Sequence, residues 1–433
     1  MAYAAQRMLD PSLNEIAERA LAEELELSRV IVTHDRVVIA DSGNASETTK
    51  TTLTLMAVCN GRPGVASMDA SGGEKALEEA VELAHERAEW NANAHGSGPL
   101  ESELPVEANG WQSALDEPTA VADPGLLAEL AASASASQTG TSVMIVSADM
   151  QTLVAARGFG SAEDRRAAAA VRATTLSSGC CSAASSKLAA LDPMLCAQMA
   201  FMHGEYGVPA ISYGSFPAII GSEALAAIID FVAAEFVADN PAGLELGAKI
   251  AAAGISLSDA PLHPGTLQRR LDDEGSEANQ VTLIERGTAS GLVSDLLTSA
   301  NDTTGHARSP FSLWAPPRPG NLVLAAGDAA DERAMAAEDG DILLISAIES
   351  LAREPNGTIS ATTAAAEIKV GGEVRFVGPL HIGLSRFGGL EHVTAMTSRQ
   401  DLHVRGDLKA PREWRSVLCP SARLSSVELR SEA

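Results

Sequence analysis

Two runs rich in β-branched residues lie close together near the start of the chain. They are SRVIVTHDRVVIA at 28–40 and KTTLTLMAVCNG at 50–61, and the SGNAS segment between them has the composition of a turn. The segment RPGVASM, at 62–68, has the pattern of a third strand. A helix with one apolar face is expected at 72–90, because its leucine, valine and alanine residues recur at helical spacing. This part of the chain is therefore predicted to form three strands followed by a long helix.

Further helices and strands are expected before the middle of the chain. The stretch at 141–158, TSVMIVSADMQTLVAARG, is interpreted as two strands around a short turn. The alanine-rich stretch at 162–188 is ambiguous, because alanine favours a helix whereas the Thr, Ser and Cys residues after it do not. The segment at 91–124 is rich in Gly, Pro, Ser and Asn and is expected to be an extended surface connection. Helices are predicted at 11–25, at 125–135 and from Asp192 to residue 207.

The second half of the chain has more strand signals, and we place a domain boundary near residue 190. The two predicted domains are therefore 1–189 and 190–433. Strands are expected at 321–328, 341–348, 357–370, 373–378 and 419–430. Helices are expected at 222–237, 243–252, 288–300 and 386–396.

The chain of 433 residues is strongly acidic, with a formal net charge of −26. Phosphate binding needs a basic surface, so no nucleic-acid partner is expected. A run of about eighteen apolar residues, the mark of a membrane-spanning helix, is missing. The N-terminus lacks an apolar signal core, and five cysteines without CxxC spacing suit a reducing compartment. The prediction is a cytoplasmic protein that binds neither nucleic acid nor a membrane.

The familiar catalytic motifs are absent from the sequence. A zinc protease helix needs two histidines about one turn apart and a carboxylate between them. The one His-Glu pair, His85–Glu86, is followed by no histidine at that spacing and suits a solvated surface helix. GxSxG, P-loop and GxGxxG motifs are also missing. The cluster of Asp272, Asp273 and Glu274 is interpreted as a solvated turn or ion-pair site, because it lacks the alternating ligands of a calcium-binding loop.

Four segments carry a resemblance to a known family. The stretch LDDEGSEANQVTLIERGTASGLVSDLLTSAND combines an acidic turn, a short strand, a helix and a loop rich in Thr and Gly. GGEKALEEAVELAHERA comes earlier in the chain, and NGTISATTAAAEIKVGGEVRFVGPLHIG and CPSARLSSVELR come later. In this order the segments resemble the TldD/PmbA family, the microcin-processing and gyrase-modulator proteases. The resemblance extends over nearly the whole chain, from residue 14 to residue 430.

The resemblance implies a two-domain α+β fold with an N-terminal α/β domain and a β-rich C-terminal domain. In the TldD branch, the helix that GSEALAAIIDFVAAEF would form carries H-E-x-x-x-H, and a late cysteine completes a zinc site. Here Ser222 and Ala227 replace the histidines, and only Glu223 remains. The late cysteine would fall near Val404–Arg405, where this chain has none. Neither serine nor alanine binds zinc, so the chain is similar to the metal-free PmbA, or TldE-like, branch.

The resemblance to that branch implies one half of a heterodimer. A TldD-like partner would carry the zinc, whereas this chain would hold no metal or other cofactor and would complete a channel for unfolded peptide. Glu223 and Arg405 are the candidate substrate-binding residues, and no residue of this chain is predicted to be catalytic. Each candidate also has a structural interpretation, because Glu223 suits the positive end of a helix dipole and Arg405 suits an ordinary surface position.

Three functions stay open from the sequence. The first is the non-metallated subunit of a heterodimeric zinc protease whose partner cleaves amide bonds of unfolded peptides. The second is the same heterodimer acting on an amide in a small natural-product intermediate, which the departures from the family pattern favour. The third is a non-enzymatic, homodimeric binding or scaffold protein.

Overall fold

The computed structural model describes most of the chain, and the statements below concern that part. The described residues are 27, 29–95, 123–156, 160–176, 179–204, 213–238, 244–299, 303–308, 316–336, 341–370, 373–377 and 379–430. The helix predicted at 11–25 and most of the connection predicted at 91–124 lie outside them. The described start of that connection, 91–95, is helical instead.

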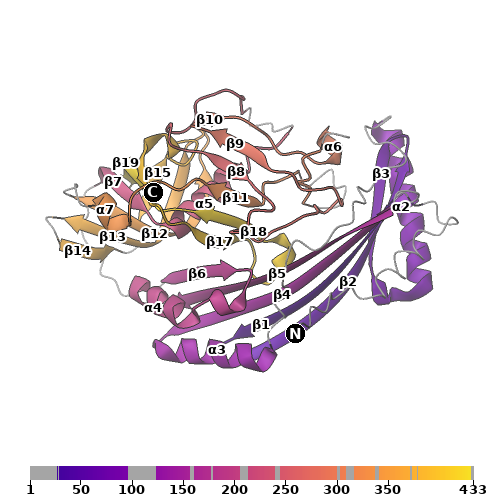
Figure 1. Ribbon diagram of the computed structural model, residues 1–433, viewed down its shortest axis with the longest axis horizontal. Coiled ribbons are helices and arrows are strands. Elements are labelled where there is room, and N and C mark those ends of the chain that lie inside the picture. Colours follow the sequence, from indigo (N-terminus) through magenta and orange to yellow (C-terminus); the bar gives the residue numbers. More distant parts are fainter. Residues whose placement is uncertain are drawn as a thin grey trace, which may run out of the picture.

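The N-terminal half is built on a long, curved antiparallel sheet of six strands in the order β3-β2-β1-β4-β5-β6 (Figure 1). The three strands and the helix predicted at its start are confirmed. The strands are β1 (Arg29–Asp41), β2 (Asn44–Cys59), β3 (Arg62–Asp69), β4 (Thr141–Ala156), β5 (Gly160–Thr175) and β6 (Cys180–Ser185). The helices of this half are α2 (Gly73–His95), α3 (Pro124–Ser137) and α4 (Pro193–Gly204).

Both faces of this sheet are covered. One face packs on the helices: Val30 and Val32 of β1 lie with α2, and Val38 lies with α3 and α4. Residues at alternate positions, such as Val37, point to the other face and meet Trp414 and its neighbours from the C-terminal half. The sheet is therefore the middle layer between a set of helices and the C-terminal domain.

Burial on both faces explains β5, where the sequence was ambiguous. Ala168 and Ala170 pack toward the C-terminal domain, whereas Val171 and Ala173 pack toward α3 and α4. Small side chains fit between these two layers, and this packing overrides the helical propensity of alanine. The prediction of two strands at 141–158 is wrong, because β4 is continuous over 16 residues and pairs along its length with β1 and β5.

The C-terminal half contains two sheets. One has the strand order β10-β9-β8-β11-β18-β17. In the other, β12, β7, β19, β15 and β13 pair in turn, and β12 pairs back with β13, so that these five strands close into a small barrel. The strands are β7 (Gly214–Ile220), β8 (Leu257–Asp259), β9 (Val281–Glu285), β10 (Thr288–Ala289), β11 (Asn321–Leu324), β12 (Ile342–Arg353), β13 (Ile359–Val370), β14 (Glu373–Val377), β15 (His381–Leu384), β16 (Val393–Met396), β17 (Asp401–Arg405), β18 (Arg415–Cys419) and β19 (Ala422–Arg430).

The helices of this half are short, and α5 is the most buried of them. They are α5 (Ser222–Ala233), α6 (Leu296–Ser299) and α7 (Glu332–Ala336). Most α5 side chains, among them Leu225, Ile228 and Val232, are part of the largest apolar core. The helix contacts β12 of the barrel and β17 and β18 of the other sheet, so it lies where the two sheets meet.

The strands predicted for this half are confirmed in position, and the helix predicted at 222–237 is confirmed as α5. Three other predicted helices are wrong. The described part of 243–252 is irregular, with a turn at 246–247 and an isolated β-bridge at Lys249, and the described part of 288–300 contains the short strand β10 and one turn of helix, α6. In 386–396, Gly388 and Gly389 have φ of 70° and 78°, a conformation that a right-handed helix does not contain.

The two-domain α+β architecture expected from the sequence is confirmed, with the barrel as an addition to it. The division at residue 190 stays a prediction. Helix α4 follows that residue in sequence, yet it packs on β5, β6 and α3 of the N-terminal sheet. No helix in the described part of the chain is long and apolar enough to cross a bilayer.

Candidate functional site

The N-terminus of α5 lies where three parts of the fold meet. Strand β7 leads into the helix through Gly221, whose backbone N–H donates to the carbonyl of Ile345 on β12. Strand β17 lies against α5, and β6, the edge strand of the N-terminal sheet, lies beside β17. Residues at the start of α5 can therefore contact both domains.

Ser222, the first residue of α5, is held by hydrogen bonds to β17. Its Oγ lies 3.0 Å from Nε2 of His403 and 3.3 Å from Oδ2 of Asp401. The thiol of Cys419 on β18 donates to the Ser222 carbonyl over 3.2 Å. The Ser222 side chain and carbonyl are thus engaged by side chains of this chain.

The His403 ring is 7% exposed, and burial lowers its pKa. Within the described residues, its Nδ1 has no hydrogen-bond partner. A buried N–H without an acceptor costs more than a bare ring nitrogen, so the proton is best placed on Nε2. His403 then donates to Ser222, and Ser222 donates to Asp401.

The strand geometry explains why these side chains face α5. Asp401, His403 and Arg405 are alternate residues of β17 and share one face of the sheet. Their partners on the neighbouring strand include Cys419, opposite Asp401, and Arg415, opposite Arg405. One face of two short strands therefore presents a row of polar groups to the helix.

Ala227, which the sequence resemblance aligned with a second histidine, is 2% exposed in the apolar core. Its methyl group offers no ligand atom, and the Ser222 oxygen is already hydrogen bonded. Among the residues that the structure describes, no three His, Cys, Asp or Glu side chains lie close enough together to hold a metal ion. The side chains at the start of α5 therefore do not fit zinc, which takes three or four N, S or carboxylate ligands.

Glu223 points away from the strands toward the N-terminal domain. Its Oε1 accepts a hydrogen bond from Ser182 Oγ over 2.6 Å, and Oε2 lies 3.4 Å from the Ser182 backbone nitrogen. Because Ser182 is on β6, this contact joins the edge of the N-terminal sheet to the first turn of α5.

Arg405 lies near two carboxylates of α5 without bonding to either. Burial lowers its pKa, whereas the charges of Asp230 and Glu223 raise it. Asp230 is instead bound by Arg415 through two hydrogen bonds of 2.6 and 2.8 Å. In the described part of the chain, the buried Nε of Arg405 has no acceptor. The guanidinium therefore keeps donors available beside the start of α5.

The structure places Glu223 and Arg405 in one neighbourhood, together with Ser222. It adds residues that the sequence reading did not single out, namely Ser182, Asp230, Asp401, His403 and Arg415. One signal could have found part of this set, because DLHVR at 401–405 alternates polar and apolar residues as a strand with one polar face does.

The acidic turn at 272–275 is a second polar cluster, and its interpretation as a solvated turn is wrong. Asp272 and Glu274 are 2% and 0% exposed. The Asp272 carboxylate accepts from the backbone N–H groups of Glu274, Ser276 and Ala307 at 2.8–3.1 Å. The alternative, an ion-pair site, is present, because Arg269 pairs with Asp273.

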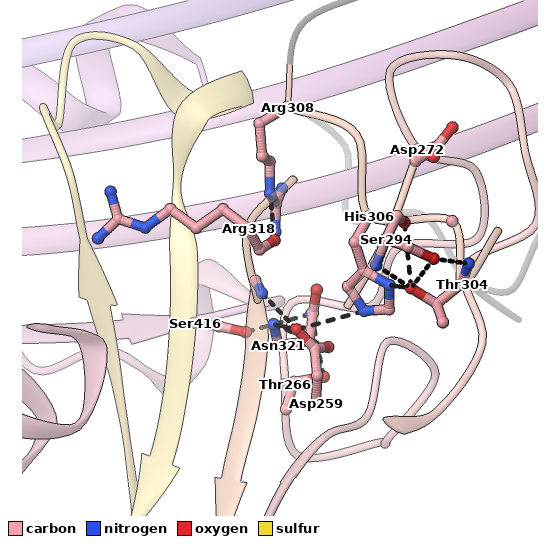
Figure 2. A network of polar contacts seen from close by, with 12 residues as sticks. Asp259, Thr266, Asp272, Ser294, Thr304, His306, Arg308, Arg318, Asn321 and Ser416 are labelled. Atoms are coloured by element: carbon pink, nitrogen blue, oxygen red, sulfur yellow. Dashed lines mark hydrogen bonds and ion pairs between the residues drawn. The ribbon is translucent and has the colours of Figure 1, made fainter. Parts of the chain in front are cut away.

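A third cluster lies at the start of β11 (Figure 2). The Asp259 carboxylate accepts from the backbone N–H groups of Gly320 and Asn321, and its Oδ2 lies 3.4 Å from His306 Nε2. Burial alone would raise the pKa of Asp259, but His306, Gly320 and Arg308 together hold it below its usual value. Thr304 and Ser294 extend the cluster beyond the histidine. His306 Nε2 meets Asp259 without a hydrogen bond in the described part of the chain, and the other contacts of the cluster are hydrogen bonds inside the domain.

Comparison with known proteins identifies the fold. The profile of the PmbA/TldA metallopeptidase C-terminal domain matches residues 214–431. The crystal structure of TldE from Thermococcus kodakarensis is similar at 18% identity, with a TM-score of 0.78 over 97% of this chain and 100% of that one. No curated protein sequence matches the chain.

Two further structures are described as candidate modulators of DNA gyrase. The one from Thermotoga maritima has 15% identity and a TM-score of 0.75 over 96% of this chain and 100% of that one. The one from Bacteroides thetaiotaomicron has 13% identity and a TM-score of 0.74 over 98% of this chain and 100% of that one.

Proposed function

The chain belongs to the PmbA/TldD metallopeptidase family, and from that premise we propose that it is the non-metallated subunit of a heterodimeric metalloprotease of the TldD/TldE type. Its partner would be a TldD-like subunit that carries zinc on the helix equivalent to α5. This chain would form part of the wall of the chamber that receives an unfolded peptide, and the partner would cleave the amide bond.

The observation that carries the proposal is the set of bonds around Ser222. A zinc site needs nitrogen, sulfur or carboxylate ligands, and a catalytic site keeps a further position open for water. A serine hydroxyl, bonded to His403 and Asp401, and the buried methyl group of Ala227 would take the two histidine positions that the resemblance implies. This arrangement supports a subunit whose α5 is built for packing and hydrogen bonding, with hydrolysis supplied by the partner.

We assign substrate binding to the neighbourhood of Glu223 and Arg405. The Nε of Arg405 has no acceptor in the described part of the chain, and a guanidinium matches the two oxygens of a peptide carboxylate. Glu223 is held by Ser182 and would border the same site. All five cysteines, each within the described residues, are free thiols, which supports placing the assembly in a reducing cytoplasm.

Co-expression with a TldD-like subunit that carries H-E-x-x-x-H tests the proposal. We expect the two chains to co-purify, zinc to follow the partner, and the pair to hydrolyse unfolded peptides until a chelator is added. Hydrolysis by this chain alone after chelation, or a stoichiometric transition metal in it, would overturn the proposal. A stable homodimer that does not bind the TldD-like subunit would also overturn the proposal and would favour a scaffold role. Comparing the rates at which the pair hydrolyses short modified amides and long unfolded peptides tests which of the two is the substrate.

A further inference from the structure

Four arginines from both domains surround Asp273 in the seam between the N-terminal sheet and the C-terminal domain. Arg166 comes from β5, and Arg269, Arg308 and Arg412 come from segments of the C-terminal half. Burial alone would raise the pKa of Asp273, but the four guanidinium charges hold it below its usual value. Asp35, Asp164 and Asp259 also lie beside members of the cluster, so what distinguishes the four arginines is which of them form ion pairs.

Two of the four arginines have carboxylate partners. Arg269 pairs with Asp273, and Arg412 pairs with Asp35 of β1. Arg412 is also fixed by hydrogen bonds to the Thr152 hydroxyl and the Gln151 carbonyl, at 3.0 and 3.1 Å. Arg412 thus connects the two domains, whereas the pair of Arg269 and Asp273 lies within the C-terminal half.

The other two arginines lack such a partner. Arg166 is 8% exposed and makes no hydrogen bond or ion pair with the described residues. Burial, with the charges of Arg269 and Arg412, lowers its pKa to about 10, against the opposite effect of Asp164 and Asp273. The nearby Asp164 bonds through Oδ2 to the backbone N–H groups of 270 and 271, and its Oδ1 is buried without a partner. Arg166 is thus a buried cation with unused donors.

Arg308 adds a second cation without an ion pair in the described structure. Its Nε donates to the Arg318 carbonyl over 3.2 Å, as Figure 2 shows. Burial lowers its pKa to about 9, with the Arg269 charge acting in the same direction. A Cβ at Gly320 would lie 1.1 Å from Arg308 Nη2, so the guanidinium occupies space that only a glycine leaves open. Part of Arg308 is exposed, which gives the cluster a route to solvent.

We propose that Arg166 and Arg308, with Arg269 and Arg412 behind them, bind a phosphate-class dianion that bridges the two domains. Arg166 and Arg308 make no ion pair with the described residues, so their guanidinium groups keep donors for such an anion. Arginine is well suited to the role, because its planar donors bond two phosphate oxygens at once. The proposal concerns this chain alone and does not depend on the proposed heterodimer.

The test uses the full chain in a Tris–chloride buffer that contains no other oxyanion. Sodium phosphate replaces sodium chloride at constant ionic strength, and calorimetry and thermal unfolding report binding. We expect saturable binding and a rise in Tm with phosphate. Arg166→Gln and Arg308→Gln should each weaken binding at least tenfold, and Arg166→Lys should weaken it less. Arg36→Gln, which removes an exposed charge from the same sheet, should bind as the wild type does.

Two further ligands define the class. If glycerol phosphate binds as tightly as inorganic phosphate, the natural ligand is a phosphate ester. If only inorganic phosphate binds, the ligand is the free ion. Both results support the site. The proposal is overturned if phosphate and chloride act alike on the wild-type chain. Equal binding by wild type and folded Arg166→Gln, or acetate that binds as tightly as phosphate, would overturn it as well.

Discussion

Nε2 of His403 lies 3.0 Å from Oγ of Ser222, and this bond joins β17 to the first residue of α5. The ring is buried, and its other nitrogen has no partner among the described residues. The serine hydroxyl is therefore the hydrogen-bond acceptor of the His403 Nε2–H group. It also continues the chain of hydrogen bonds to Asp401.

Replacing Ser222 with alanine should destabilise the protein. The change removes the acceptor for a buried histidine N–H, and an unsatisfied buried donor costs about 1–3 kcal/mol. Urea unfolding at pH 7.5 measures the free energy of unfolding. Ser46→Ala, on the exposed part of β2, is the matched control and should change it by less than about 0.5 kcal/mol. Equal stability of wild type and Ser222→Ala would show that the bond contributes nothing.

The stability of the protein should depend on pH through His403. Its pKa in the folded state lies below that in the unfolded state, because burial disfavours the charged ring. Below pH about 6.5 the ring of the unfolded state binds a proton that the folded state does not yet bind. The folded protein therefore has its full stability above that pH and loses stability as the pH falls. The slope is at most about 1.4 kcal/mol per pH unit.

Unfolding curves between pH 5 and 8 test this dependence. His403→Gln should flatten the pH dependence relative to wild type over the acidic half of that range. His392→Gln, which changes an exposed histidine, should leave the slope unchanged. The explanation fails if the His403 variant keeps the wild-type slope.

The elements that sequence reasoning predicted best are those in which local pattern and packing agree. The strands at 28–40 and 50–61 alternate in the sequence and lie in a sheet, and Asp192 begins a helix because its carboxylate accepts the backbone N–H of Leu195. Strand β5 could not be predicted in this way, because its alanines are selected by two covering layers rather than by local propensity.

The candidate site was only partly predictable for a similar reason. The resemblance located Ser222, Glu223 and Ala227, since all three are close in sequence on one helix. The partners Ser182 and His403 come from other parts of the chain, and only the tertiary fold brings them to α5. The turn that contains Glu274 was expected to be exposed because a polar composition suggests solvent, whereas the surrounding segments bury it.

Removing Arg412 should weaken the contact between the domains. Its guanidinium bonds Asp35 and Thr152 of the N-terminal sheet, and all of these groups are partly buried. Arg412→Ala should lower the free energy of unfolding by about 1–3 kcal/mol, as expected for lost hydrogen bonds to charged groups. Arg36→Ala, whose pair with Glu47 is exposed, should cost less than about 1 kcal/mol.

The two variants are compared by tryptophan fluorescence, to which the buried Trp414, two residues from Arg412, contributes, and by far-UV circular dichroism. We expect the two signals to separate in Arg412→Ala and to coincide in Arg36→Ala. An Arg412 variant that unfolds in one transition with wild-type stability would mean that the ion pair does not couple the domains.

Glu274 should oppose His403 in its effect on the pH dependence of stability. Burial, and then the charge of Asp272, raise the pKa of Glu274 well above its usual value. The protonated side chain of Glu274 therefore contributes its full stability below pH about 4.5, and this stability is lost as the pH rises through the pKa of the folded state. Glu274→Gln cannot ionise, so its stability relative to wild type should increase with pH by at most about 1.4 kcal/mol per unit. Unfolding at pH 5 and pH 8 measures this change, with the exposed Glu129→Gln as control; a difference that shrinks with pH would contradict it.

Variants of Glu223 and of its partner Ser182 can distinguish a structural role of Glu223 from a role in substrate binding. If the carboxylate mainly joins β6 to α5, Glu223→Ala and Ser182→Ala should each cost about 1–2 kcal/mol, and the double variant should cost clearly less than their sum. If it also borders the substrate, Glu223→Ala should raise the KM of the assembled heterodimer for a peptide, whereas Ser182→Ala should do so much less. A purely structural residue would lower stability equally in both variants and leave both KM values at the wild-type level. Additive stability losses, by contrast, would show that the two side chains do not interact.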